Sequence, residues 1–302
     1  MSDFTPLAVL VIAVVGAFAV ACLEQLVAGR SPSPALLARH VVATIRQPLA
    51  RPETHDAWLF HLAPPLLLVA AVTALATVPW APGFRGIDLA VGVLLFGAAL
   101  AYVTPAIFMA GWGAGRPLAV VGGFRFVAQM LAYAMPLTMA VTAVATPAAS
   151  LRPVAIVEVQ QSVPMLVSQP LAFALFVPSV MAVAFIAPFD LPQARHELGG
   201  GVFSAYTGVQ AGMVTLAQRV LLFAAAGMTS ALFLAGWHGP VLPPALWMAV
   251  KTLSVAALML WAGRRLPRLE IEPLLSFAWK VAIPAAIGAI VWAGLVTLLF
   301  YS

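Results

Sequence analysis

Charged side chains are scarce in this chain: Asp, Glu, Lys and Arg together make up 8% of its 302 residues, whereas hydrophobic residues make up 63%. Ordinary soluble domains carry about a quarter of their residues as charges, so the composition excludes that class. Apolar runs of about 20 residues, long enough to cross a bilayer core, recur from end to end. The composition therefore predicts a multi-pass integral membrane protein, surrounded by the lipid bilayer.

Cysteine is nearly absent as well. The single Cys22 can form no disulfide within the chain, and an iron–sulfur cluster generally needs four protein ligands. The five histidines are scattered rather than paired on one helix face, as a haem or metal site would suggest. We therefore expect that this chain binds no cofactor and no metal, and that other subunits carry any electrons.

The apolar runs are expected to be helices, because each backbone N–H and C=O must be satisfied within its own segment where water is absent. Windows of about 20 residues predict an all-α integral membrane fold with eight transmembrane helices over Leu7–Leu23, Trp58–Val78, Leu89–Ala110, Phe126–Thr146, Leu171–Ala187, Val209–Gly236, Leu246–Ala262 and Val281–Phe300. Residues 1–302 are expected to form a single membrane domain.

Lys and Arg are divided unevenly between the two sets of connections. Most of them lie in the links after the first, third, fifth and seventh predicted helices, and the opposite side holds only Arg85 and Arg152. By the positive-inside rule, the four basic links face the cytoplasm and both termini lie outside. The net charge of +5 mostly reflects this asymmetry, so no nucleic-acid partner is implied.

One cytoplasmic segment, residues 29–56, carries a helical pattern of its own. From Pro34 to Leu49 the apolar residues recur at helical spacing, with Arg39 and Arg46 on the other face. This pattern predicts an amphipathic helix that lies on the membrane or against a partner. The alternative is a polar linker in which the residues alternate by chance.

A second cytoplasmic segment, the charged loop 188–208, holds Asp190, Arg195, His196 and Glu197. Asp190 followed by Gln193 is typical of a helix start, where the carboxylate caps free N–H groups. Glu197 then falls seven residues later, on the same helix face. Two carboxylates beside apolar helices either relay protons or engage a polar ligand; the alternative is a helix cap plus a solvated Glu.

Residues Ala187 to Gly208, APFDLPQARHELGGGVFSAYTG, resemble the loop APFDLPEAESEL…EYSG of the respiratory complex I subunit 1 family, to which the H subunit of bacterial NADH–quinone oxidoreductase belongs. Further segments resemble that family in the same order: the AGW at 110–112, Arg125 with the AQM at 128–130, Lys251, the LPR at 266–268 and the WK at 279–280. The resemblance covers about residues 57 to 300, and its motifs are specific as a set.

The resemblance implies a multi-pass subunit of the cell inner (plasma) membrane that anchors a peripheral redox arm and lines a quinone or quinone-like cavity. It implies iron–sulfur and quinone-site peripheral subunits and antiporter-like membrane subunits as partners, with a quinone at the subunit interface. The candidates for the quinone cavity or proton path are Asp190, Glu197, Arg195, Arg125, Gln218, Arg219 and Lys251, and those for the peripheral-arm interface are Arg39, Arg46, His196, Arg265 and Arg268. Whether the subunit is itself catalytic stays open.

Two of these candidates have a second interpretation. Arg219 either stands at the cytoplasmic end of a helix that begins before the membrane, or is a positive partner for Asp190 or Glu197. Lys251 either snorkels toward the outer surface or belongs to an interior polar axis, and the resemblance favours the interior role.

The chain departs from the family where the family pattern has acids, because it has Ala134, Gln193, Arg195, Ala205 and Gln218 at those positions. Replacing an intramembrane carboxylate removes a protonatable step, so we expect a reduced set of coupling acids. The same fold serves membrane-bound nickel–iron hydrogenases and formate hydrogenlyases, an alternative favoured by the short amino-terminal region. A stand-alone transporter is the alternative from another class, although no inverted repeat is evident.

Overall fold

The computed structural model describes residues 6–49, 56–82, 84–85, 87–161, 163–193, 197 and 199–300. Within these residues, seven helices are long and apolar enough to cross a membrane. They are α1 (Pro6–Val27), α3 (Ala57–Ala76), α4 (Gly92–Gly113), α5 (Pro117–Ala148), α10 (Gly208–Phe233), α11 (Pro244–Arg265) and a C-terminal helix in which α12 (Ile271–Phe277) continues through a π-helical turn (Ala278–Ala282) into α13 (Ile283–Phe300). The fold is therefore an all-α membrane bundle.

The remaining predicted span, Leu171–Ala187, contains the shorter helix α8 (Pro170–Val183), which has 14 residues. At 1.5 Å per residue α8 extends about 21 Å, less than the ~30 Å of a typical hydrocarbon core. A short helix, α7 (Met165–Ser168), precedes it, and the backbone leaves the helix before Phe185, whose φ is +41°. The count of eight spans therefore stays a prediction.

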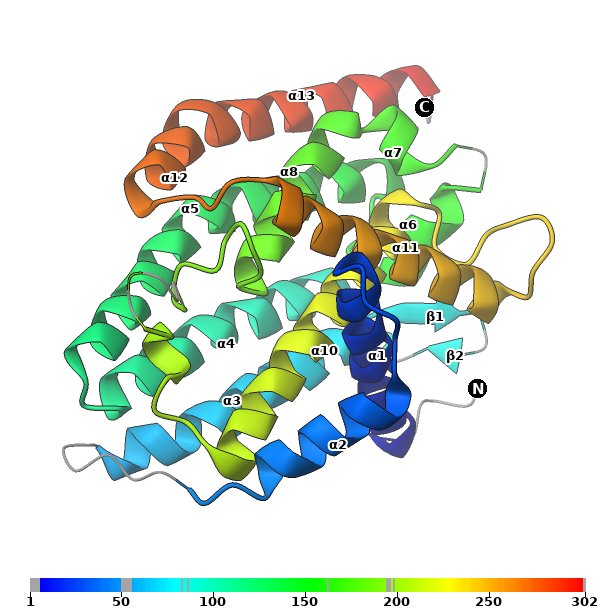
Figure 1. Ribbon diagram of the computed structural model, residues 1–302. Coiled ribbons are helices and arrows are strands. Elements are labelled where there is room, and N and C mark those ends of the chain that lie inside the picture. Colours follow the sequence, from blue (N-terminus) through cyan, green and yellow to red (C-terminus); the bar gives the residue numbers. More distant parts are fainter. Residues whose placement is uncertain are drawn as a thin grey trace.

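The connections gather at two ends of the bundle (Figure 1). One end, which we call the loop end, carries α2 (Pro34–Ile45), the start of α5 and the segment around the 3-10 turn η1 (Gly201–Phe203). The other, the hairpin end, carries α6 (Pro153–Val159) and the antiparallel strands β1 (Pro79–Ala81) and β2 (Phe84–Arg85), in which Pro79 pairs with Arg85 and Ala81 with Phe84.

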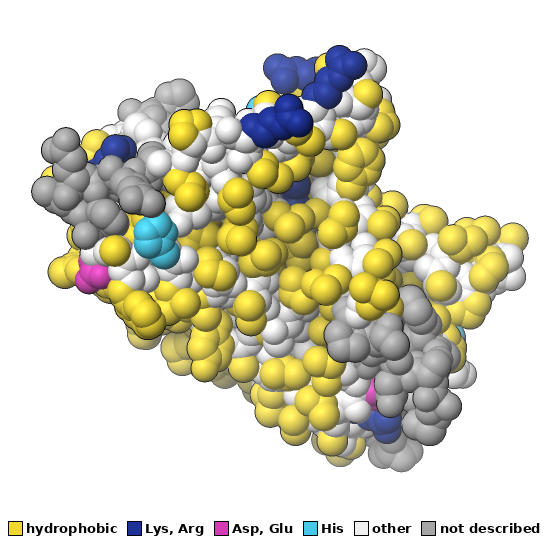
Figure 2. Space-filling view, turned by 90° about the horizontal axis from the view of Figure 1, so that it is seen from below, with side chains coloured by type: hydrophobic (Ala, Val, Ile, Leu, Met, Phe, Trp, Pro, Cys, Tyr) yellow, Lys and Arg dark blue, Asp and Glu magenta, His cyan; other side chains and the backbone are white. Residues whose placement is uncertain are grey.

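Helix α10 forms the centre of the bundle. Within its most apolar stretch 83% of the residues are buried, against 28% for α1 and for α11. The run Ala224–Ala225–Ala226–Gly227 lies in this helix, and small residues of this kind let neighbouring backbones approach closely in membranes. The outer helices turn apolar side chains outward, so the face seen in Figure 2 is mostly hydrophobic and most of its Lys and Arg side chains lie toward the margins.

Helix α2 lies where the sequence predicts an amphipathic segment, and it ends at Ile45, four residues before Leu49. Leu37 is buried, whereas Val41, Val42 and Ile45 are largely exposed. Helix α2 packs against α10 at the loop end. Helix α2 therefore covers one side of α10. Part of the apolar surface of α2 is left uncovered by the chain itself.

Candidate functional site

The charged loop after α8 is held against several elements at the loop end of the bundle. The Thr207 hydroxyl donates to the Pro48 carbonyl oxygen at 2.7 Å, just after α2. The Tyr206 hydroxyl donates to the Phe60 carbonyl oxygen of α3 at 3.0 Å. The backbone N–H of Leu269, between α11 and α12, donates to the Pro188 carbonyl oxygen at 3.3 Å. These contacts join segments from most of the chain into one surface.

The two predicted loop carboxylates form ion pairs with arginines from different elements. Asp190 Oδ2 lies 3.3 Å from Arg268 Nη2 in the linker between α11 and α12. Glu197 Oε2 lies 2.5 Å from Arg125 Nη1 of α5. The structure therefore brings together four of the predicted site residues, as two separate pairs.

The predicted helix start at Asp190 is wrong, because residues 191–193 form a turn instead of a first helical turn. The N–H of Gln193 donates to the main-chain carbonyl of Asp190 at 3.1 Å, and the Asp190 carboxylate faces Arg268. A leucine and a proline follow Asp190, and proline supplies no N–H for a cap. The predicted Arg195 and His196 lie outside the described residues.

Tyr206 is a buried anchor of this loop that a search for charged residues misses. Its ring stacks on that of Phe60, with centroids 4.3 Å apart and planes 3° from parallel. Burial raises the pKa of its hydroxyl above the ordinary value, so the group stays a neutral hydrogen-bond donor. The signal that could have identified it is the motif AYTG, whose tyrosine matches the family pattern without indicating a role.

Two glycines let the loop lie directly on α5. Gly201 has φ +56°, which L side chains rarely adopt, and a Cβ there would collide with the Pro192 carbonyl oxygen. A Cβ at Gly122 of α5 would lie 2.7 Å from the same oxygen. Because neither position has room for a side chain, the turn at Pro192 can approach the α5 backbone closely.

Arg219 belongs to a second cluster, at the loop end of α1, α10 and α11. Its Nη2 lies 3.0 Å from Glu24 Oε2 near the end of α1, and Arg264 Nη2 donates to the Glu24 carbonyl oxygen at 3.0 Å. The proposed pairing of Arg219 with Asp190 or Glu197 is therefore wrong. The neighbouring Gln218 donates through Nε2 to the Phe185 carbonyl oxygen at 3.2 Å.

Lys251 lies at the opposite, hairpin end of α10. Its Nζ donates to the carbonyl oxygens of Leu234, Gly236 and His238, at 2.6, 2.9 and 2.8 Å. All three ammonium hydrogens are thereby used, on carbonyls at and beyond the C-terminus of α10, where a positive charge is favourable. The contacts show that Lys251 caps the end of α10, and its role in an interior polar axis stays a prediction.

The predicted arm-interface arginines lie at the loop end. Arg39 and Arg46, on and just after α2, and Arg265 at the end of α11 are exposed, and Arg268 is 48% exposed beside Asp190. The Arg265 guanidinium lies 5.6 Å from the centre of the Trp261 ring. These cations leave donors available at the surface of this end.

An open cleft of about 510 Å³ lies beside the start of α3, lined by Ala57, Trp58, His61 and Leu62. The Trp58 side chain is 76% exposed, and Gln210 Nε2 of α10 lies 2.6 Å from His61 Nδ1. The cleft thus combines an apolar wall with a hydrogen-bonding imidazole, a combination common in sites for small amphipathic molecules.

Carboxylates are rare in the spanning helices that the structure describes. Helices α3, α4, α5, α8, α10, α11 and α13 contain no Asp or Glu. Helix α1 contains only Glu24, close to its end, and α12 contains only Glu272, in its first turn. Among the described residues, no group of three or more His, Cys, Asp or Glu side chains is placed to hold a metal ion.

Comparison with known proteins identifies the family. The family model described as NADH dehydrogenase matches residues 39–294. The NADH-quinone oxidoreductase H subunit numbered 2 in Syntrophobacter fumaroxidans is 36% identical over 252 residues, which cover 80% of this chain and 76% of the relative. The NADH-quinone oxidoreductase H subunit of Geobacillus kaustophilus is 36% identical over 255 residues, 83% and 76% of the two chains.

The corresponding protein of Syntrophotalea carbinolica is 34% identical over 242 residues, which cover 77% of this chain and 73% of the relative. The family resemblance predicted from the motifs is thus confirmed over most of the chain. The apolar helices place the protein in a membrane, in multiple passes. The chain belongs to the NADH dehydrogenase family, complex I subunit 1, together with the H subunits of bacterial NADH-quinone oxidoreductases.

Proposed function

We propose that this chain is the membrane subunit of a complex I-like oxidoreductase on which the peripheral redox arm docks, with the loop end as the docking surface. The observation that carries the proposal is that the described residues of loop 188–208 are tied to α2, α3, α5 and the α11–α12 linker, by the contacts of Thr207, Tyr206, Glu197 and Asp190. Residues held on so many elements offer a pre-organised surface, which loses little entropy on binding.

The distribution of positive charge supports placing the loop end in the cytoplasm. Arg30, Arg39, Arg46, Arg116, Arg125, Arg264, Arg265 and Arg268 lie in or beside its connections, whereas the hairpin end has Arg85, Arg152 and Lys251. The positive-inside rule assigns the richer side to the cytoplasm. Both termini then lie outside, and the exposed arginines face soluble partner subunits that carry iron–sulfur clusters.

A quinone site at the interface with those partners is the second part of the proposal. The cleft at Trp58 and His61 opens at the loop end and has a volume within the range of small-molecule sites. An aromatic, apolar wall suits a quinone ring and its tail, while the imidazole of His61 supplies a polar contact. This chain then provides one wall of the site, and its partner provides the other.

Proton coupling through this subunit is proposed to be weak. The spanning helices hold no carboxylate apart from Glu24 and Glu272, each close to a helix end. Glu24, Asp190 and Glu197 are each paired with an arginine. The described carboxylates therefore form no continuous line across the bundle. Proton translocation would therefore depend on antiporter-like membrane partners.

Purification from the native membrane in mild detergent tests the docking role. We expect the chain to co-purify with iron–sulfur subunits, and charge-reversing substitutions at Arg39 and Arg265 to weaken that association as the salt concentration rises. Recovery as a homogeneous particle without soluble subunits contradicts the proposal. The identity of the soluble partner also separates the alternatives, because a nickel-binding large subunit identifies a hydrogenase.

A photoreactive quinone tests the second part. Cross-links at residues 57–62 are expected in the assembled complex, and Trp58→Ala should reduce them. Trp279→Ala is the matched control, since Trp279 is an exposed tryptophan on the C-terminal helix. Quinone cross-links confined to other segments contradict the assignment of this cleft while leaving the docking role intact.

A further inference from the structure

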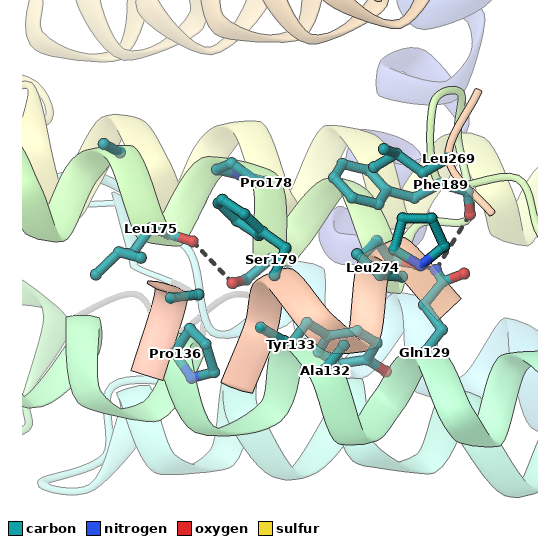
Figure 3. A pocket seen from close by; sticks show the side chains of 16 residues that line it. Gln129, Ala132, Tyr133, Pro136, Leu175, Pro178, Ser179, Phe189, Leu269 and Leu274 are labelled. Atoms are coloured by element: carbon teal, nitrogen blue, oxygen red, sulfur yellow. Dashed lines mark hydrogen bonds between the residues drawn. The ribbon is translucent and has the colours of Figure 1, made fainter. Parts of the chain in front are cut away.

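A second cavity, of about 480 Å³, lies between α5, α8 and the C-terminal helix (Figure 3). Of its 16 lining residues only Gln129, Tyr133 and Ser179 carry a polar side-chain atom. The Ser179 hydroxyl is turned to its own helix, donating to the Leu175 carbonyl oxygen at 2.7 Å. The cavity is therefore apolar over most of its length, and it borders the loop end only at Phe189 and Leu269.

The cavity exists because three helices present small side chains to one another. Ala132 of α5, Ala182 of α8 and Ala278 at the π-helical turn line it. Protein interiors are normally packed without such voids, since an empty space forfeits dispersion contacts. In a membrane, the molecules available to fill an apolar space beside the outer helices are those of the bilayer.

The two ends of the cavity differ in polarity. Leu175 and Pro136 lie toward one end in Figure 3, and Gln129, Phe189 and Leu269 lie toward the other. Gln129 is fully buried; its Nε2 donates to the carbonyl oxygens of Ala182 and Phe189, at 2.7 and 3.1 Å. Its Oε1 has no hydrogen-bond partner among the described residues.

A cation stands next to the polar end. Phe189 and Leu269 line the cavity, and their chain neighbours Asp190 and Arg268 form the 3.3 Å ion pair. Arg268 is 48% exposed, and a guanidinium has five N–H donors, so donors remain after the contact with Asp190. Arginine binds phosphate with particular geometric specificity.

We propose that this cavity binds one acyl chain of an anionic phospholipid, whose headgroup phosphate is bound by Arg268. The apolar length of the cavity accepts the chain, and the half-exposed arginine beside its polar end matches the charge and the position of the headgroup. The volume is that of a ligand site. The lipid thereby fills the space between α5, α8 and the C-terminal helix and joins them at their loop ends.

Photolabelling of the intact complex tests the site. The complex is placed in nanodiscs that contain phosphatidylglycerol with a diazirine on one acyl chain, and the labelled peptides are identified by mass spectrometry. We expect labels on the segments that contribute Ala132, Ala174 and Phe277. Ala174→Phe, which enters the cavity from an exposed position, should remove most of this labelling. Ala101→Phe, at an exposed alanine of α4 outside the cavity, should leave it unchanged.

The headgroup is tested separately. Arg268→Gln should lower labelling by the anionic lipid about fivefold, the usual effect of one basic residue at an anionic surface, and should change labelling by phosphatidylcholine with the same diazirine very little. Arg152→Gln, which removes a half-exposed arginine paired with Asp88 at the hairpin end, serves as the matched control. Uniform labelling around the bundle that Ala174→Phe does not alter overturns the proposal. Preferential labelling by a diazirine quinone, or a cross-link from the cavity to a partner helix, also overturns it.

Discussion

Asp190 and Arg268 form an ion pair across 78 residues of sequence, with Oδ2 and Nη2 separated by 3.3 Å. The aspartate side chain is 17% exposed, so the pair is partly shielded from water. It fixes the start of the charged loop to the linker between α11 and α12, beside the backbone hydrogen bond from Leu269 to Pro188.

This pairing changes what substitutions at Asp190 should do. Asparagine caps helices nearly as well as aspartate, so a capping role would make Asp190→Asn harmless and Asp190→Ala damaging. The ion pair predicts instead that both variants lose about 1 kcal/mol of stability, because both lack the carboxylate. Thermal unfolding of the purified complex measures this. A fully stable Asp190→Asn beside a weakened Asp190→Ala contradicts it.

Alanine substitutions at two glycines after Glu197 test how closely the loop packs on the turn at Pro192. Gly199 and Gly201 have φ of +57° and +56°, so alanine at either costs about 1–2 kcal/mol for the left-handed conformation. A Cβ at Gly199 meets nothing within 4 Å, whereas one at Gly201 collides with the Pro192 carbonyl oxygen. Gly201→Ala should therefore release soluble subunits during purification, and Gly199→Ala should retain most of them. Equal retention in the two variants would falsify the close packing of this turn.

The spanning helices were predictable because their apolar runs leave the backbone no alternative to internal hydrogen bonds. Helix α3 begins one residue before its predicted start at Trp58 and ends two before its predicted end at Val78. Helix α5 begins at Pro117 rather than Phe126. Arg125 and two glycines lower the hydropathy there, but they allow the helix to continue beyond the apolar stretch.

The contacts of the candidate site were not predictable from spacing. Glu24 and Arg219 are 195 residues apart, and Arg125 and Glu197 are 72 residues apart. A pattern along one chain identifies a face of a helix, but it does not identify which helix packs against that face. For the same reason the sequence does not show that the Lys251 ammonium group caps the end of α10.

Lys251→Met tests the capping assignment. The variant keeps a long apolar stem but leaves three carbonyl oxygens without their donor, which should cost about 2 kcal/mol of stability. We expect a lower unfolding temperature and an unchanged turnover per assembled complex. Loss of turnover with unchanged unfolding temperature would instead assign Lys251 to catalysis or coupling. Lys280→Met, at an exposed lysine on the C-terminal helix, controls for the loss of charge.

His238 should make stability depend on pH. Burial, and then the positive charge of Lys251, lowers the pKa of His238, while Glu158 acts weakly in the opposite direction. The folded protein therefore binds this proton less readily than the unfolded chain. Neutral His238 therefore contributes to the free energy of unfolding at pH values above about 6.5, the pKa of histidine in the unfolded chain. This contribution is lost as the pH falls through that value toward the lower pKa of His238 in the folded protein. Unfolding temperatures measured across this window should fall on acidification, and His238→Gln should flatten that part of the profile.

Two positions in the bundle test whether the missing acids limit coupling. Gln218 donates to the Phe185 carbonyl oxygen at 3.2 Å, and the carboxyl group of a protonated glutamate there has a donor for the same oxygen. Ala134 lies next to Tyr133 on α5 and is half-buried. The double variant Ala134→Glu/Gln218→Glu therefore adds one carboxyl group to each of the helices α5 and α10, which hold no Asp or Glu of their own.

In proteoliposomes, we expect the unmodified complex to translocate few protons per electron through this subunit, and the double variant to translocate more. Gln218→Met, which fills a similar volume without a titratable group, should leave the ratio unchanged while costing about 1–3 kcal/mol, because it leaves the Phe185 carbonyl oxygen without its donor. The expectation is wrong if the unmodified complex already pumps at full stoichiometry and the replacement of both Asp190 and Glu197 leaves that stoichiometry intact. In that case the protons follow a route that needs no carboxylate of this chain.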